Sequence, residues 1–184
     1  ITDIGHVQAK ETGIYLNSVL NKNADIKIWN SPYQRTRQTA QIIKDNLKDF
    51  RYEEEESLYI GERQFGVLDS AENYSHEYKE EVKHYLMHKK EKHDFFVRPS
   101  LGESPYDMCL RLDAFINFYL KTTTNTQHVL VLHGAAIKGF LMMWLKKNYE
   151  WYNEQNNSHN AAIHYIDEYN KYHGEIFTPS DITG

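Results

Sequence analysis

The sequence predicts an α/β fold, a three-layer α/β/α sandwich around a mostly parallel central sheet. Two segments each place a short apolar strand directly before a turn and a helix. The first strand covers residues 25–30, and the second is Val129–Leu132, which stops at His133. Strands that alternate with helices in this way form parallel sheets with helices on both faces. We expect residues 1–184 to form one domain, because this length supports a single core.

Helix signals place the other elements in order. Thr2 can cap a helix over about residues 3–20, whose apolar positions repeat with helical spacing. A second helix covers about residues 36–47, and its apolar face packs on the sheet. The Ser-Pro pair at 104–105 is typical of the start of a third helix. Residues 161–166 form the last predicted strand.

Segments rich in charge are expected at the surface. The run Glu53–Glu56 indicates a solvated loop or a sheet edge. Residues 72–94 are rich in Glu, Lys, Tyr and His, which predicts exposed helix inside a lid-like insertion over 70–100. His84 and His88 have the spacing of helical metal ligands. No third ligand is evident, so we interpret them as a solvated helix face and expect no metal.

The composition excludes several classes of function. The formal net charge is −5, which argues against the basic surface that nucleic-acid binders use. No apolar run approaches the roughly 20 residues that a membrane-spanning helix needs. The single cysteine, Cys109, lies in an amphipathic helical pattern and is interpreted as a core residue. Because a lone cysteine forms no internal disulfide, a reducing, cytoplasmic location is favoured.

Two basic side chains follow the two predicted strands. Arg35 stands at the entrance of the helix after the first strand, and His133 ends the second. The carboxyl ends of parallel strands meet at one edge of the sheet, where open α/β folds bind ligands. The helix dipole disfavours an arginine in the first turn unless an anion is also present. A strand-end histidine can instead hydrogen-bond a loop carbonyl, but the pair together indicates anion chemistry, most naturally on phosphate.

One carboxyl group has the setting of a general acid. Glu62 follows Gly61, and Arg63 and Phe65 are close in sequence. Partial desolvation there would let the carboxyl hold its proton near neutral pH. The alternative is that Glu62 only pairs with Arg63 or with another surface cation.

Five motifs then follow one another in the order of a known family. They are Thr2–Ala9, Ser31–Ala40, Gly61–Gly66, Gly102–Ser104 and His133-Gly134. Each motif is only moderately specific, but together they span nearly the whole chain. In this order the sequence resembles the histidine phosphatase superfamily, the phosphoglycerate-mutase-like group.

The resemblance implies a phosphohistidine mechanism that needs neither cofactor nor metal. In that family a histidine of an Arg-His-Gly motif attacks phosphorus, and water then hydrolyses the phosphoenzyme. Carried over to this sequence, Arg35 would hold the phosphoryl oxygens and His133 would stabilise the transition state. Glu62 would protonate the leaving oxygen and later activate water. Such chemistry depends chiefly on positioning and charge. The further groups expected at the phosphate or substrate are Arg63, Gly134 and Ala135.

The sequence departs from the family pattern at one important point. It contains no Arg-His-Gly, and His6 cannot substitute because it lies inside the first predicted helix. We expect the motif and a first central strand to lie upstream of Ile1. The absence of an initial Met favours this expectation. The alternative is a catalytically dead relative.

We therefore predict a phosphatase that hydrolyses a small phosphomonoester, either a metabolite or a nucleotide. The residues with which the related mutases bind carboxylate and phosphate, near Phe65 and over residues 69–73, are not found here. A phosphoglycerate-mutase-type phosphotransferase and a phosphate-binding pseudophosphatase stay as alternatives. The roles of Glu103 and Lys138 stay open, as does the oligomeric state. Glu103 either orients a site arginine or caps its helix.

Overall fold

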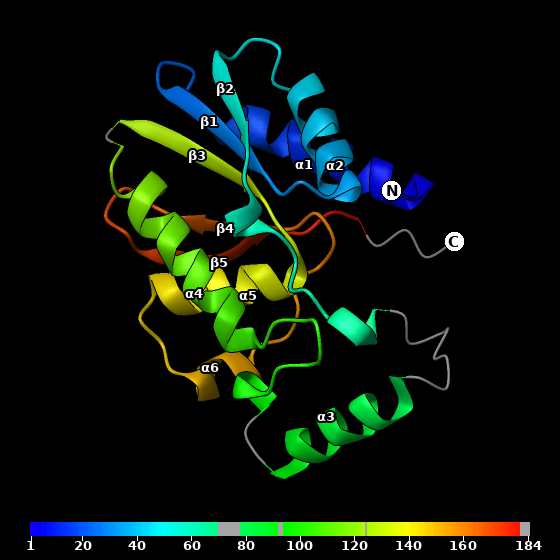
Figure 1. Ribbon diagram of the computed structural model, residues 1–184. Coiled ribbons are helices and arrows are strands. Elements are labelled where there is room, and N and C mark those ends of the chain that lie inside the picture. Colours follow the sequence, from blue (N-terminus) through cyan, green and yellow to red (C-terminus); the bar gives the residue numbers. More distant parts are fainter. Residues whose placement is uncertain (70–77, 92–93, 124, 181–184) are drawn as a thin grey trace.

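A parallel sheet forms the centre of the molecule. The computed structural model describes residues 1–69, 78–91, 94–123 and 125–180. Within them, the sheet has the strand order β2-β1-β3, and both pairs of neighbours run parallel (Figure 1). The predicted parallel sheet is therefore confirmed. The strands are β1 (Asp25–Asn30), β2 (Tyr52–Glu56) and β3 (Thr126–Val131).

Helices cover the two faces of this sheet, as the three-layer prediction requires. Helices α1 and α2 lie on one face, and α4 and α5 lie on the other with α6 next to them (Figure 1). Five helices make up these layers: α1 (Asp3–Val19), α2 (Gln34–Asp45), α4 (Pro105–Phe115), α5 (Gly134–Trp144) and α6 (Tyr149–Glu154).

Strand β1 separates two hydrophobic clusters by alternation. Ile26 and Ile28 point into the cluster shared with α1 and α2. Trp29 points to the opposite face, where its ring meets the Phe115 ring edge-on at 5.0 Å. Since neighbouring residues of a strand face opposite sides, one strand anchors both helical layers. The buried Cys109 belongs to the Trp29 cluster, and burial raises the pKa of its thiol to about 12, as expected of a core residue.

Two of the predicted helix starts, those of α1 and α4, carry side-chain caps. Thr2 Oγ1 accepts from the Gly5 amide at 3.1 Å at the start of α1. Ser104 and Asp107 cap the start of α4 reciprocally. Arg98 binds the Asp107 carboxylate, and this contact lowers the pKa of Asp107 to about 2. These caps fix where the helices begin and therefore where the preceding loops lie.

The charged insertion contains an exposed helix, α3 (Lys79–Glu91). It lies apart from the sheet and contacts the short helices η2 (Gly66–Leu68) and η5 (Asp94–Phe96) (Figure 1). Parts of the predicted insertion, 70–77 and 92–93, lie outside the described residues. The lid function of 70–100 and the single-domain organisation stay predictions. The remaining short elements are η1 (Leu58–Ile60) and the π-helical turn η6 (Ile116–Leu120).

The acidic run forms the edge strand β2 rather than a loop. Its carboxylates alternate between partners: Glu55 binds Lys27 at 2.7 Å, and Glu54 binds Lys44 at 2.5 Å. Lysines of β1 and α2 therefore offset the repulsion within the run.

The prediction that 161–166 is the last strand was wrong. Strand β4 (Ile163–Ile166) continues through a turn into β5 (Tyr172–Phe177), and the two form an antiparallel hairpin. In the turn, Asp167 Oδ1 accepts from the amides of Tyr169 and Lys171. The hydrophobic pattern does not predict this second strand because it contains His173, Gly174 and Glu175, which are not apolar.

No helix among the residues that the structure describes combines the length and apolarity that crossing a membrane requires.

Candidate active site

The carboxyl ends of β1 and β3 converge on one site. The Ser31 amide donates to the Val131 carbonyl at 3.3 Å, which joins the two strand ends. Directly beyond them begin α2, with Arg35 in its first turn, and α5, with His133 as the capping residue. The predicted convergence of two strand-turn-helix units is thus present in the structure.

His133 is held from both ring nitrogens. Nδ1 accepts from Arg35 Nε at 3.1 Å, so Nε2 carries the proton and donates to Ser31 Oγ at 2.8 Å. The residue is only 5% exposed. Burial, together with the nearby charges of Arg35 and Arg111, lowers the pKa of His133 to about 4. The imidazole is therefore neutral at physiological pH in this arrangement.

Glu62 completes the group of three. Its Oε2 lies 3.5 Å from Arg35 Nη2 and 3.6 Å from His133 Nδ1. Its Oε1 accepts from the Arg63 backbone amide at 3.0 Å. Burial raises the pKa of Glu62 even though two arginines oppose the shift. The structure thus brings Arg35, Glu62 and His133 together, and Glu62 has the raised pKa that a proton donor requires.

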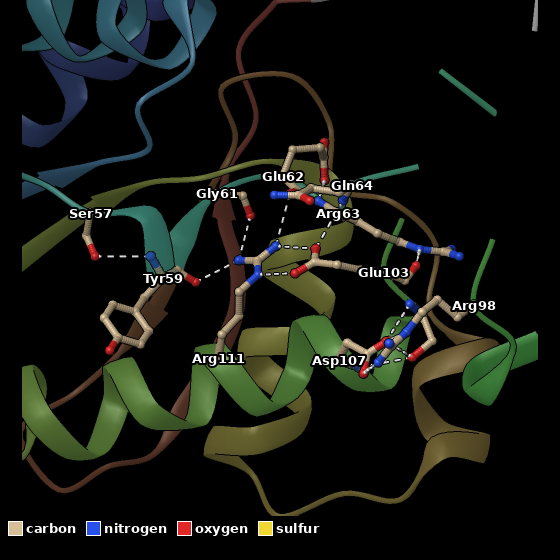
Figure 2. A network of polar contacts seen from close by, with 11 residues as sticks. Ser57, Tyr59, Gly61, Glu62, Arg63, Gln64, Arg98, Glu103, Asp107 and Arg111 are labelled. Atoms are coloured by element: carbon tan, nitrogen blue, oxygen red, sulfur yellow. Dashed lines mark hydrogen bonds and ion pairs between the residues drawn. The ribbon is translucent and has the colours of Figure 1, made fainter. Parts of the chain in front are cut away.

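Arg63 does not join this group. Its guanidinium donates to the Glu103 carbonyl at 2.8 Å and to the Tyr85 hydroxyl of α3 at 3.4 Å, and it lies over the Phe65 ring. Figure 2 shows the Arg63 side chain extending away from the Glu62 carboxylate. Packing against Phe65 and α3 explains this direction. The expectation that Arg63 binds phosphate therefore gains no support from the geometry.

Arg111 is a site residue that sequence reasoning missed. Its guanidinium, from α4, reaches under the segment that carries Glu62 (Figure 2). It also forms a two-pronged ion pair with the Glu103 carboxylate, at 2.9 and 3.0 Å. The carbonyls that accept from it are those of Tyr59 at 2.7 Å, Gly61 at 3.0 Å and Glu62 at 2.9 Å. Arg111 thereby fixes the backbone on which Glu62 stands.

The role of Glu103 follows from this contact. Besides binding Arg111, its Oε2 accepts from the Gln64 amide at 3.0 Å. The cap of α4 is made by Ser104 and Asp107 instead. Glu103 therefore orients an arginine rather than capping its helix. The sequence contains one sign of this role: Arg111 is a charged residue next to the apolar stripe of α4.

Gly134 and Ala135 are the first two residues of α5, and no side chain caps this helix. The first amides of a helix lack acceptors within the helix and attract anions. Lys138, one turn later, donates to the Gln155 carbonyl at 3.3 Å and lies over the Tyr152 ring. It thus holds the loop after α6 against α5, which gives this lysine a structural role.

The other histidines lie outside the site. His6 is an exposed residue of α1, as predicted. His84 and His88 face each other on α3, with their Nε2 atoms 2.9 Å apart. Among the described residues, no three His, Cys, Asp or Glu side chains gather as a metal site would require.

The comparisons identify the family. The profile of the histidine phosphatase superfamily (branch 1) matches residues 1–178. The chain belongs to this superfamily. The phosphoglycerate mutase-like protein AT74 of Arabidopsis thaliana is 27% identical over 178 residues, covering 89% of this chain and 54% of the relative. The chain thus spans about half the length of that curated relative.

Solved structures share the fold at low sequence identity. The YhfR protein of Bacillus stearothermophilus has a TM-score of 0.69 at 16% identity, covering 95% of this chain and 82% of that one. A mycobacterial glucosyl-3-phosphoglycerate phosphatase has 0.64 at 16%, covering 88% and 75%. An Entamoeba histolytica phosphoserine phosphatase mutant in complex with phosphoserine has 0.64 at 24%, covering 89% and 76%.

Proposed function

We propose that this protein hydrolyses a small phosphomonoester at Arg35, Glu62 and His133, through a phosphohistidine. The observation that carries the proposal is one contact set: the Arg35 guanidinium touches both the His133 imidazole and the Glu62 carboxylate. A cation, a neutral imidazole and a carboxyl with a raised pKa around one point are the groups that phosphoryl transfer uses.

Arg35 is suited to bind the phosphoryl oxygens. Its side chain is 51% exposed, and its contacts of 3.1 Å to His133 and 3.5 Å to Glu62 are long enough to be exchanged for stronger ones. A dianionic phosphoryl group offers two oxygens to the planar guanidinium. The amides of Gly134 and Ala135 would bind the same group from the start of α5.

His133 and Glu62 would handle charge and protons. A bound dianion favours the protonated imidazole, so His133 would take up a proton and stabilise the equatorial oxygens. Glu62, in its protonated form, would give its proton to the leaving oxygen. The resulting carboxylate would then take a proton from the attacking water. The nucleophile would be the histidine of the family's Arg-His-Gly motif, which residues 1–184 do not contain.

The substrate class rests on the relatives. The mycobacterial and Entamoeba phosphatases are named for glucosyl-3-phosphoglycerate and phosphoserine, which are small phosphorylated metabolites. We propose a substrate of this size, with no cofactor, no nucleic-acid partner and a reducing, cytoplasmic setting. Two alternatives stay open. The name of the Arabidopsis relative favours a mutase. A phosphate-binding pseudophosphatase is the alternative if another residue stands in place of the nucleophilic histidine.

Phosphate release by the full-length protein tests the proposal. We expect turnover of phosphoserine or a phosphoglycerate without 2,3-bisphosphoglycerate and with excess chelator present. Turnover that requires the bisphosphate would establish the mutase. Tight orthovanadate binding without any turnover would establish the pseudophosphatase. If neither vanadate nor phosphate binds, the proposed site is wrong.

A further inference from the structure

The Tyr33 ring lies against two of the three side chains of the candidate site. The Arg35 guanidinium carbon is 4.8 Å from the centre of its ring. The His133 ring meets it edge-on, with centroids 5.0 Å apart and planes at 72°. A Cβ on Gly61, the neighbour of Glu62, would lie 3.9 Å from its Cε2. One aromatic ring thus contacts the arginine and the histidine, and it lies next to Gly61, the neighbour of Glu62.

The backbone of Tyr33 already meets the needs of α2. Its carbonyl accepts from the Thr36 hydroxyl at 2.8 Å and from the amides of Thr36 and Arg37 at 3.1 Å. The side chain makes no capping hydrogen bond. The helix can therefore begin at this residue with another side chain in place, and the position of the ring serves the site rather than the helix.

Arg35 needs such a support because its own contacts are few. Its side chain is long and half exposed, and ordering it in one rotamer costs conformational entropy. The face of an aromatic ring attracts a guanidinium and holds its plane parallel to the ring. A cation–π contact of usual strength corresponds to roughly 2- to 30-fold in the population of the ordered rotamer.

The same ring covers His133. The imidazole is 5% exposed, and its edge-on contact with Tyr33 is part of that cover. Besides Tyr33, the groups facing the imidazole are Arg35, Glu62 and Ser31. Removing the ring would admit water next to the imidazole while leaving these polar partners in place.

We propose that Tyr33 is a positioning residue: its ring sets the Arg35 guanidinium and the His133 imidazole in the orientation that receives an oxyanion. This inference deepens the proposed function and rests on it. The aromatic ring, and not the phenol hydroxyl, carries the effect, because the contacts with Arg35 and His133 are made by the ring.

Three variants of the full-length protein test the proposal: Tyr33→Phe keeps the ring, while Tyr33→Leu and Tyr33→Gln remove it. Inorganic phosphate is the probe, and its dissociation constant is measured by titration calorimetry. We expect Tyr33→Leu and Tyr33→Gln to weaken phosphate binding roughly 5- to 30-fold, and Tyr33→Phe to stay within about 2-fold. The matched control is Tyr52→Leu, which removes a tyrosine of similar exposure, 38% against 36%, from β2.

A second readout separates positioning from general loss of structure. NMR titration of the His133 ring should show its pKa rising toward the ordinary value in Tyr33→Leu and staying low in Tyr33→Phe. A folded Leu or Gln variant with wild-type phosphate affinity would overturn the proposal. So would equal losses in Phe and Leu, because the hydroxyl would then be responsible. Failure of the full-length wild-type protein to bind phosphate would instead overturn the proposed function itself.

Discussion

Two arginines of this molecule, Arg111 and Arg35, have opposite surroundings. Arg111 is mostly buried, and its guanidinium makes five hydrogen bonds of 2.7–3.0 Å to three carbonyls and one carboxylate. Arg35 is half exposed and has two longer contacts, of 3.1 and 3.5 Å. A guanidinium whose N–H groups all have acceptors fixes structure, whereas one with few acceptors retains donors for a ligand.

The difference indicates that the two arginines have separate roles. Arg111 and Glu103 hold the backbone on which Glu62 stands, and Arg35 meets the Glu62 carboxyl from the opposite helical layer. Stability is therefore expected to depend on Arg111, and oxyanion binding on Arg35. Five experiments can break or sharpen this contrast.

The largest expected effect is on turnover. Arg35→Ala in the full-length protein should lower kcat/KM for a phosphomonoester roughly 100-fold or more, because it would remove the cation proposed to stabilise transition-state charge. The free energy of unfolding should barely change, since the side chain is exposed. Arg37→Ala is the matched control: this arginine lies two residues further along α2 and binds Glu56 at the surface. Equal losses in the two variants would end the contrast.

The next effect is on stability. Arg111→Met should lower the free energy of unfolding by about 2 kcal/mol, because Glu103 and three carbonyls lose a mostly buried donor. Urea denaturation measures it. Arg98→Met, which breaks the more exposed ion pair with Asp107, should cost much less. An Arg111 variant as stable as the wild type would show that the network is not structural.

The third effect is on protonation. The pKa of His133 is about 4 because of burial and the charge of Arg35. Phosphate binding should raise this pKa by roughly one unit or more, since a dianion favours the imidazolium. NMR titration with and without phosphate measures the shift. A pKa of His133 that stays near 4 with phosphate bound would remove the histidine from the oxyanion site.

The lowered pKa of His133 also determines how the stability of the fold changes with pH. The unfolded chain, with an ordinary histidine, binds more protons than the folded one between pH 6.5 and 4. The His133 contribution to stability is therefore present above pH 6.5 and is lost as the pH falls toward 4. His133→Gln should flatten this part of the stability profile.

The smallest effect concerns Ser31. Its hydroxyl accepts from His133 Nε2 and so keeps the proton away from Nδ1. Ser31→Ala should lower kcat/KM by roughly 5-fold, which is the size expected for one neutral hydrogen bond. Ser18→Ala, at an exposed serine of α1, should leave kcat/KM unchanged. A Ser31 variant with full activity would show that this hydrogen bond does not matter for orientation.

Much of the fold was predictable because its signals are local. The caps at Thr2 and Ser104 involve residues three positions apart, so they can be predicted from the sequence. Strand β5 was missed because its polar residues break the alternation, and pairing with β4 supplies what the pattern lacks. Local propensity thus failed where a neighbouring strand decided the outcome.

The sequence by itself determined that Arg35 and His133 each follow a parallel strand, and that both therefore lie at one edge of the sheet. Only the tertiary structure decided that Glu62 meets them, that Arg111 holds it there and that Arg63 points elsewhere. These outcomes depend on contacts between residues far apart in the chain: 98 positions separate Arg35 from His133, and 49 separate Arg111 from Glu62. The physical reason is that strand ends and caps are fixed by neighbours in sequence, whereas a buried guanidinium takes whichever carbonyls and carboxylates the packed layers bring within reach.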